Sequence, residues 1–328
     1  MKKSNKNILL SALSVLLLAA GCTTTATVVP NPTASATMEP GTSPTMSPSA
    51  TAMPTAEPTM MPTTSPTATA MPTAMPSPSP SANVNKTVYA LDNNNTLYRI
   101  SSSIPSTVNS SVVINGLQPL EKIIGIDFRP SDKRLYGIGT SNRVYIIDPA
   151  TGGTTVIGGA FNPVINGTTF GFDFNPVADR IRLHSNTEQN LRLNPVNGVV
   201  AFTDTNLAYA DNDLNAGANP NIVGSAYTNS MAGATSTQLY AIDSDRDILV
   251  RFDNPDSGKM TTVGPLGVNT NDNVGFDIDA SSGMAYAALN IGGGISGLYT
   301  VNLNTGAVSQ IENIGTNNPI RGIAVDSN

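Results

Sequence analysis

The chain has 328 residues but no tryptophan, a single cysteine and a single histidine. With one cysteine, the mature fold has no disulfide of its own. Aromatic residues make up 5% of the sequence, so the broad ring faces that commonly pack against sugars are scarce. Charged residues make up 12%, the net charge is -6, and Lys and Arg form no cluster after the first few residues. This balance argues against a nucleic-acid-binding protein.

The sequence also lacks common catalytic motifs. A Ser-His-Asp triad would need His184, which its strand-like surroundings predict to be buried, and no Gly-x-Ser-x-Gly turn precedes a helix. No glycine loop stands between a strand and a helix to bind phosphate, because the glycines of residues 290–297 fit a hairpin tip. These absences favour a protein that binds over one that catalyses, and they indicate no cofactor.

The first 21 residues are typical of an export signal. Three lysines within the first six residues precede an apolar run over residues 8–20, which is too short to span a bilayer stably. The run ends in LAAGC, which resembles the bacterial lipobox, where cleavage before the cysteine leaves its sulfur to carry diacylglycerol. The resemblance implies a lipoprotein signal peptide over 1–21 and a lipid on Cys22 that anchors the protein in a membrane, on the extracytoplasmic side of the bacterial cell envelope.

Residues 22–85 are dominated by Thr, Pro, Ser, Ala and Met and cannot form a packed core. Frequent proline favours extended polyproline II, so we expect a disordered, semi-stiff stalk. The remaining residues, 86–328, are enough for one sizeable domain.

A glycine-led strand recurs through this domain at intervals of 46 to 53 residues. Its copies are GIDF at 125, GFDF at 171, GSAY at 224, GFDI at 275 and GIAV at 322. After each of the first four come an apolar hairpin, a polar turn and a Val/Thr-rich strand, which is the pattern of a four-stranded propeller blade. The last copy stops after one strand, and residues 87–100 supply a hairpin without a leading strand. We therefore predict an all-β, five-bladed propeller whose N- and C-terminal strands join in one blade.

Three aspartates at alternate positions, Asp243, Asp245 and Asp247, look like the start of a calcium loop. An EF-hand loop would also need glycine at its sixth position and glutamate at its twelfth, where Ile248 and Asn254 stand. The same hairpin tip in other copies is polar and unrelated in charge, so we interpret these aspartates mainly as turn residues.

Four stretches of the repeat region resemble the bacterial domain-of-unknown-function family numbered 4394. They are GFDFNPVADRIRLHSNTEQNLRLNP, LYAIDSDRDILVRF, GFDIDASSGMAYAAL and SGLYTVNLNTGAV. The resemblance covers about residues 87–326 and implies a secreted or surface propeller-like domain. It implies no reaction, so no catalytic residue is carried over.

Tyrosines repeat at equivalent positions of the second and third strands, and we expect them to pack between blades. They are Tyr89, Tyr136, Tyr240 and Tyr286 in the second strand, and Tyr98, Tyr145 and Tyr299 in the third. The copy that begins at 171 differs, with Arg182 and Arg192 in these two places. His184 and Arg180 share the face of Arg182 by the two-residue period of a strand.

Arginines between blades need negative partners. One interpretation is an internal ion-pair network with Asp173 or a carboxylate of the next blade, with the guanidinium groups stacked on tyrosines. The other is an anionic ligand, a carboxylate or an acidic sugar, held by Arg182 and Arg192 beside His184 and Arg180.

Asp127, Asp173 and Asp277 share the third position of their leading strands, while Ala226 and Ala324 occupy it in the other two. Since leading strands line a propeller channel, the three carboxylates are candidates for a cation site or a glycosidase-like set. Alternatively each binds the backbone of a neighbouring blade or an arginine, namely Arg129, Arg180 or Arg321. The nature of any metal stays open. A general acid of the usual kind is lacking, because no glutamate of this domain lies on a leading strand.

The sequence thus predicts a cell-envelope lipoprotein whose propeller is a binding or scaffolding module for a protein or an anionic ligand. The alternative is an extracytoplasmic enzyme of hydrolase or lyase type, acting on an anionic or carbohydrate substrate at the channel.

Overall fold

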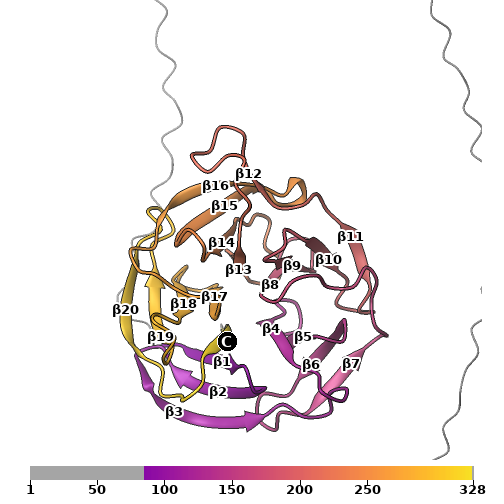
Figure 1. Cartoon of the computed structure of the whole chain (residues 1–328). Coiled ribbons are helices and arrows are strands. Elements are labelled where there is room, and N and C mark those ends of the chain that lie inside the picture. The colour runs from indigo at the N-terminus through magenta and orange to yellow at the C-terminus, as the bar shows by residue number, and fades with distance from the viewer. Residues whose placement is uncertain (1–84, 327–328) are drawn as a thin grey trace, which may run out of the picture. The chain divides into compact units, whose positions relative to one another are not determined.

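A computed structural model describes residues 85–326, which form an all-β, five-bladed propeller (Figure 1). The predicted fold is confirmed. The signal peptide, the lipid site at Cys22 and most of the stalk lie outside the described residues. No helix within the described part is long and apolar enough to cross a membrane.

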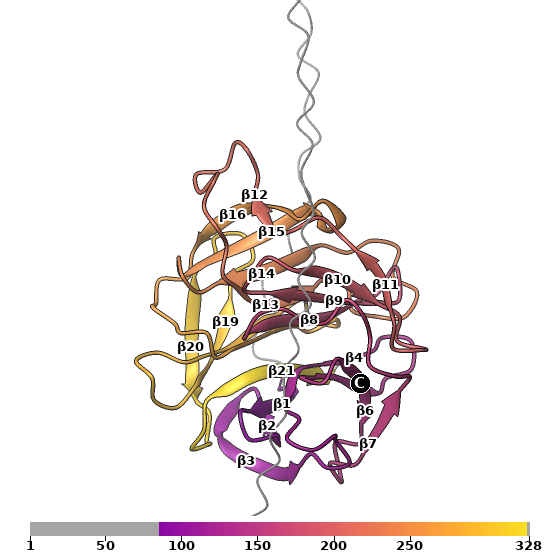
Figure 2. The same ribbon diagram turned by 45° about the vertical axis from the view of Figure 1, so that its right-hand side comes forward.

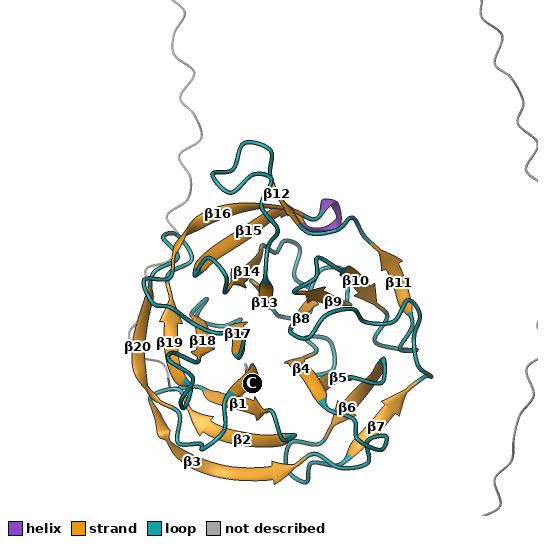
Figure 3. Ribbon diagram, viewed as in Figure 1, coloured by secondary structure: helices purple, strands orange, loops and turns teal. Residues whose placement is uncertain are grey.

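Each blade is an antiparallel sheet whose leading strand lies nearest the axis (Figures 1 and 3). Blade 1 contains β4 (Ile123–Phe128), β5 (Leu135–Gly139), β6 (Arg143–Ile147) and β7 (Thr154–Ile157). Blade 2 contains β8 (Phe170–Asn175), β9 (Arg180–Ser185), β10 (Asn190–Leu193) and β11 (Val200–Thr203). Blade 3 contains β13 (Ile222–Tyr227), β14 (Leu239–Asp243), β15 (Ile248–Asn254) and β16 (Lys259–Pro265). Blade 4 contains β17 (Val274–Ile278), β18 (Ala285–Leu289), β19 (Gly297–Val301) and β20 (Val308–Asn313).

Blade 5 closes the ring as the sequence predicts. Its leading strand is β21 (Ile320–Asp326) from the C-terminal end, followed by β1 (Thr87–Asp92), β2 (Thr96–Ser101) and β3 (Ile104–Val113). Val88 pairs with Val325 and Tyr89 with Ala324 in this antiparallel register. Residues from the two ends of the domain therefore share one sheet.

Blade 3 carries one strand that the repeat pattern did not predict. β12 (Ala208–Tyr209) runs parallel to β16 and covers its outer edge. It belongs to the long connection from blade 2 to blade 3, which stands out from the ring in Figures 1 and 2. A strand of two residues within an irregular connection is too short to be predicted from the periodicity of apolar residues.

The glycine that begins each repeat lets the leading strands approach closely around the axis. A Cβ atom added to Gly125 would lie 2.5 Å from the Cβ of Phe172, in the next blade. At Gly275 it would lie 2.6 Å from the backbone nitrogen of Ile323. Both distances are shorter than any real Cβ contact, so a side chain at either position would force neighbouring leading strands apart.

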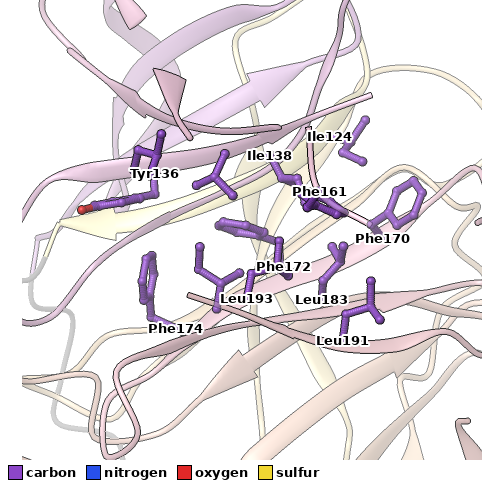
Figure 4. Close-up of a cluster of buried hydrophobic side chains, with 13 residues drawn as sticks. Ile124, Tyr136, Ile138, Phe161, Phe170, Phe172, Phe174, Leu183, Leu191 and Leu193 are labelled. Atoms are coloured by element: carbon purple, nitrogen blue, oxygen red, sulfur yellow. The ribbon is translucent and has the colours of Figure 1, made fainter. Parts of the chain in front are cut away.

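Apolar side chains fill most interfaces between blades. Figure 4 shows the cluster between blades 1 and 2, in which Phe172 and Phe174 lie near Tyr136. The Tyr136 and Phe174 rings meet edge to face, with centroids 5.1 Å apart. Tyr89 of blade 5 meets Phe128 of blade 1 in the same way at 5.6 Å. These tyrosines pack between blades, as their repeat positions predict, and burying such rings is among the largest contributions to stability.

Candidate functional site

Three carboxylates meet at the propeller axis. Asp127, Asp173 and Asp277 come from the leading strands of blades 1, 2 and 4, and each is 2 to 4% exposed. One oxygen from each lies within 4.8 Å of the others. The five leading strands lie side by side around the axis (Figure 1). Equivalent positions therefore form a layer, and the structure brings the three predicted channel residues together.

The three carboxylates serve five backbone N–H groups of the next layer. Asp127 accepts one from Phe174 of blade 2, Asp173 one from Tyr227 of blade 3, and Asp277 one from Val325 of blade 5. The distances are 2.8, 3.1 and 2.6 Å. Each carboxylate therefore ties its blade to the next.

The two remaining N–H groups belong to blades 1 and 4, which come directly after the two blades with alanine at the third position of the leading strand. Ala324 and Ala226 have no side-chain oxygen to accept an N–H group of the following blade. In that blade the aspartate accepts the N–H of the residue that follows it in the sequence. Asp127 accepts from Phe128 at 2.7 Å, and Asp277 accepts from Ile278 at 2.6 Å. Five of the six carboxylate oxygens are thus engaged, and Oδ2 of Asp173 is the one that accepts no hydrogen bond from the described residues.

Burial and mutual repulsion favour the protonated forms of these groups. Burial raises the pKa of Asp277 to about 7. Burial, with the charge of Asp277, raises the pKa of Asp127 well above its ordinary value. Burial and the charges of Asp127 and Asp277 do the same for the pKa of Asp173. Three carboxyl groups this close cannot all be ionised unless a cation compensates their charge, and otherwise at least one of them keeps its proton.

The carboxylates offer a cation little free coordination. Their spacing suits oxygen ligands of a Ca²⁺-sized ion, which bind at about 2.3–2.6 Å. Most of the oxygens already accept backbone N–H groups, so a cation would share them. The adjoining cavity, lined by Asp127, Arg129, Lys133 and Asp277 among others, leaves about 10 Å³ for the centre of a water-sized sphere. That is room for about one water molecule. Arg182 does not line this cavity.

Arg182 and Arg192 lie together at the interface of blades 2 and 3, where they form a closed network with two aspartates. Arg182 contacts Asp204 at 2.5 Å and Asp256 at 2.7 Å. Arg192 contacts the same two carboxylates at 2.7 and 3.0 Å. Asp173, the partner that the sequence suggested, is not among them, whereas Asp256 does come from the next blade.

Two further donors of Arg182 are also occupied. Arg182 is 2% exposed and donates to Oδ1 of Asn190 at 2.8 Å and to the Tyr227 hydroxyl at 3.3 Å. The guanidinium of Arg192 lies 4.1 Å from the centroid of the Phe202 ring, not over a tyrosine as expected. Two positive and two negative charges balance within the protein, which leaves no net charge for an anion to neutralise.

His184 lies beside this network and is fully buried. Its Nδ1 is 2.9 Å from the Ser225 hydroxyl, and its ring stacks on Phe252 at 5.0 Å. Its Nε2 is buried without a hydrogen bond among the described residues. Burial, and then the charge of Arg182, hold the pKa of His184 well below its ordinary value. The neutral imidazole is sealed between blades, away from solvent.

Arg180 stands apart from the other three predicted residues. Its guanidinium donates to the backbone carbonyls of Asp179 at 2.8 Å and Ala178 at 3.5 Å. The structure therefore brings together Arg182, Arg192 and His184 but not Arg180.

The three aspartates of the suspected calcium loop serve the backbone and loop contacts. Asp243 accepts from the N–H groups of Asp245 and Arg246, at 3.0 and 3.2 Å. Asp247 accepts from the N–H of Thr270 at 2.8 Å. Across residues 85–326 the axial trio is the one set of three acidic or metal-binding side chains grouped closely enough to hold a metal.

Asp204 and Asp256 escaped sequence reasoning because they lie in connections, where the strand period that located Arg182 does not apply. Asp256 sits in a short 3-10 turn, Pro255–Ser257, of the neighbouring blade. An aligned comparison of turns would not find it, since its contact with Arg182 depends on how blades 2 and 3 pack.

The sequence profile of a family described as a domain of unknown function (DUF4394) matches residues 96–324. The chain belongs to this family. The resemblance noted in the sequence is thereby confirmed, and the DUF4394 profile includes strands of all five blades but not β1. No curated protein matches the chain.

Several solved structures resemble the DUF4394 propeller at low identity. A protein of unknown function from Bacteroides thetaiotaomicron is 16% identical, with a TM-score of 0.45 over 75% of this chain and 66% of that one. TolB from Acinetobacter baumannii is 12% identical, with a TM-score of 0.41 over 74% and 66%. Glutaminyl cyclase from Myxococcus xanthus is 12% identical, with a TM-score of 0.41 over 69% and 95%. The chain spans just under two thirds of the first two, and these likenesses carry no functional argument.

Proposed function

We propose that this protein is a non-catalytic binding or scaffolding module of the bacterial cell envelope, held at a membrane by a lipid on Cys22. The observation that supports this role is that every candidate catalytic group has a structural partner. The axial carboxylates accept interblade N–H groups, Arg182 and Arg192 are neutralised by two aspartates, and His184 is sealed between blades.

The surface offers a better candidate for recognition than the interior. The end of the ring at which the leading strands begin, here called the mouth face, is built from loops. Large apolar side chains project from two of these loops: Leu120 is 99% exposed and Val164 58%. Exposed apolar side chains on neighbouring loops are typical of an interaction surface.

The first test concerns the anchor. Cells that express the full chain, fed a labelled fatty acid, should incorporate the label into this protein, and Cys22→Ser should abolish the incorporation and release the protein from membranes. Unchanged labelling and membrane association of the Cys22→Ser variant would refute the lipid anchor.

The second test concerns binding. Residues 83–328, which contain the whole closed ring, should bind saturably to isolated envelopes of the source bacterium. Leu120→Asp with Val164→Asp should weaken this binding at least about tenfold, since a charge at a contact centre is costly. Val196→Asp is the matched control, because Val196 is 71% exposed but lies in a turn at the opposite end of the ring. Equal effects of the two variants, or release of a chemically altered envelope component, would contradict the proposal.

A further inference from the structure

Arg321 interrupts an apolar collar at the mouth of the channel. The residue that precedes the repeat glycine occupies the same position in all five leading strands. These residues are Ile124, Phe170, Val223, Val274 and Arg321. They line two adjoining cavities at and just inside the mouth. Four are apolar and one is a guanidinium, so the substitution of Arg for an aliphatic residue needs a physical reason.

Arg321 has little inside the protein to balance its charge. It is partly buried, and it donates one hydrogen bond, from Nη1 to the carbonyl of Ile123 at 3.2 Å. No carboxylate of residues 85–326 lies within ion-pair distance of it, unlike Arg129, Arg182 and Arg192. Burial lowers the pKa of Arg321 from its ordinary value, which shows that the site disfavours an unaccompanied positive charge.

Two aspartates lie near enough to matter but are committed elsewhere. Asp92 attracts Arg321 from beyond ion-pair distance. Its own oxygens accept from the N–H groups of Asn94 and Thr96 and from Nδ2 of Asn318. Asp272, in the cavity wall, accepts from Ser244 and Asn221 at 2.8 and 3.0 Å. Neither neutralises the guanidinium directly.

The cavity at the mouth offers a second unused polar group. It is lined by Ile124, Thr168, Thr169, Phe170, Val223, Asp272, Asn273 and Arg321. The hydroxyl of Thr169 is buried there without a hydrogen-bond partner in the described chain. The cavity leaves about 20 Å³ for the centres of water-sized spheres, which corresponds to one or two water molecules. Two such spheres match the two oxygens of a carboxylate group.

We propose that Arg321 and Thr169 form a binding site for a carboxylate group that enters the channel from the mouth face. The planar guanidinium matches a carboxylate in geometry and charge. The Thr169 hydroxyl donates to one carboxylate oxygen, and the apolar collar excludes water from the ion pair. The rest of the ligand lies outside, above the loops of the mouth face.

The cost of burial selects among anions. Arg321 attracts and Asp272 repels any anion, and both effects double for a dianion, so they largely cancel in either case. The cost of taking the anion out of water rises more steeply with its charge. The site therefore favours a carboxylate over a phosphate dianion. It is distinct from the Arg182–Arg192 network, which is neutral, and it does not depend on the envelope role, since its failure leaves the loop surface available for a partner.

The test uses thermal unfolding of residues 83–328 at pH 7.5 with sodium acetate, sodium phosphate or sodium chloride at equal ionic strength. Acetate should raise the midpoint by about 5–10 °C over chloride at a concentration near 100 times its dissociation constant. Arg321→Leu, which restores the apolar residue of the other repeats, should abolish the shift while its midpoint in chloride equals or exceeds that of the wild type. Thr169→Val should fold normally and bind acetate at least about threefold more weakly in calorimetric titration.

Three outcomes would overturn the proposal. One is the absence of an acetate shift in the wild type, and another is an equal shift in Arg321→Leu, which would place acetate elsewhere. A phosphate shift as large as that of acetate would overturn the carboxylate preference. Arg134→Leu is the control for loss of a positive charge, because Arg134 pairs with Asp132 near the opposite end of the ring and should leave acetate binding unchanged.

Discussion

Oδ2 of Asp277 accepts the backbone N–H of Val325 at 2.6 Å, across the junction where the C-terminal strand β21 closes the ring. Oδ1 of the same carboxylate accepts the N–H of Ile278. One side chain thus satisfies two buried donors in two blades. Since unsatisfied buried donors are costly, this aspartate is a structural tie as well as a member of the axial cluster.

Replacement of Asp277 by alanine should therefore strongly destabilise the protein. Two buried N–H groups would lose their acceptor, at about 1–3 kcal/mol each. We expect the free energy of unfolding in urea to fall by about 2–6 kcal/mol, with an intermediate loss for Asp277→Asn, which keeps one acceptor oxygen. Asp253→Ala, at an exposed side chain, is the control and should change stability by less than about 0.5 kcal/mol. A loss as small for Asp277→Ala would show that the tie contributes nothing.

The raised pKa of Asp277 predicts a stability that falls as pH rises. Burial raises its folded-state pKa to about 7, against about 4 in the unfolded chain. Between about pH 4 and 7 the folded state therefore keeps a proton that the unfolded chain has lost. The contribution of this proton to the stability of the fold is complete below about pH 4 and is lost as pH rises through about 7. Urea unfolding from pH 4.5 to 7.5 should show this decline in the wild type and a flatter profile in Asp277→Asn. Parallel profiles would mean that Asp277 does not titrate in this range.

His184 should have the opposite pH dependence. Its pKa in the folded state lies well below its ordinary value of about 6.5, because it is buried near Arg182. The unfolded chain then binds the extra proton as pH falls below about 6.5, and stability is progressively lost. We expect His184→Leu to reduce the loss of stability between pH 6.5 and 5. Asp277 titrates in the same range with the opposite sign, so the comparison is made in the Asp277→Asn background. An unchanged acid slope on adding His184→Leu would contradict the assignment.

The Arg182 network should be energetically coupled. Arg182→Leu leaves Asp204, 7% exposed in its side chain, paired with Arg192 alone and also removes the hydrogen bonds to Asn190 and Tyr227, so it should cost about 3 kcal/mol. Asp204→Leu combined with Arg182→Leu should cost less than the sum of the single changes. The exposed pair Arg251–Asp253, 3.4 Å apart, provides the matched cycle and should show a coupling of no more than about 1 kcal/mol. Additive effects at Arg182 and Asp204 would argue against a cooperative network.

Gly275 tests the close approach of leading strands. The Cβ atom of Gly275→Ala would meet the backbone of Gly322 and Ile323, which cannot move aside cheaply. We expect a loss of about 3 kcal/mol in thermal or urea unfolding. Gly159→Ala has no atom within 4 Å of the new Cβ and serves as the control. Similar behaviour of the two variants would show that the leading strands are not tightly packed.

The repeat in the sequence was enough to determine the fold, the leading strands and the ring closure. Each blade is a local hairpin array, so its signals recur at short range in the chain, and GIAV at 322 had no other strand to pair with than the N-terminal hairpin. The same comparison of copies identified Asp127, Asp173 and Asp277 as neighbours and Arg182 and Arg192 as exceptions, because equivalent positions in a ring must share a layer.

Only the tertiary structure decided what those side chains do. Whether Arg182 meets a ligand or Asp256 depends on a turn 74 residues away in the chain, which strand periodicity does not place. Three carboxylates serve five N–H groups because blades are arranged around a common axis, a relationship without any local signature. The exception at Arg321 is visible in the sequence, but its lack of a carboxylate partner emerges only when the leading strands stand side by side, since charge balance is a property of three-dimensional distance.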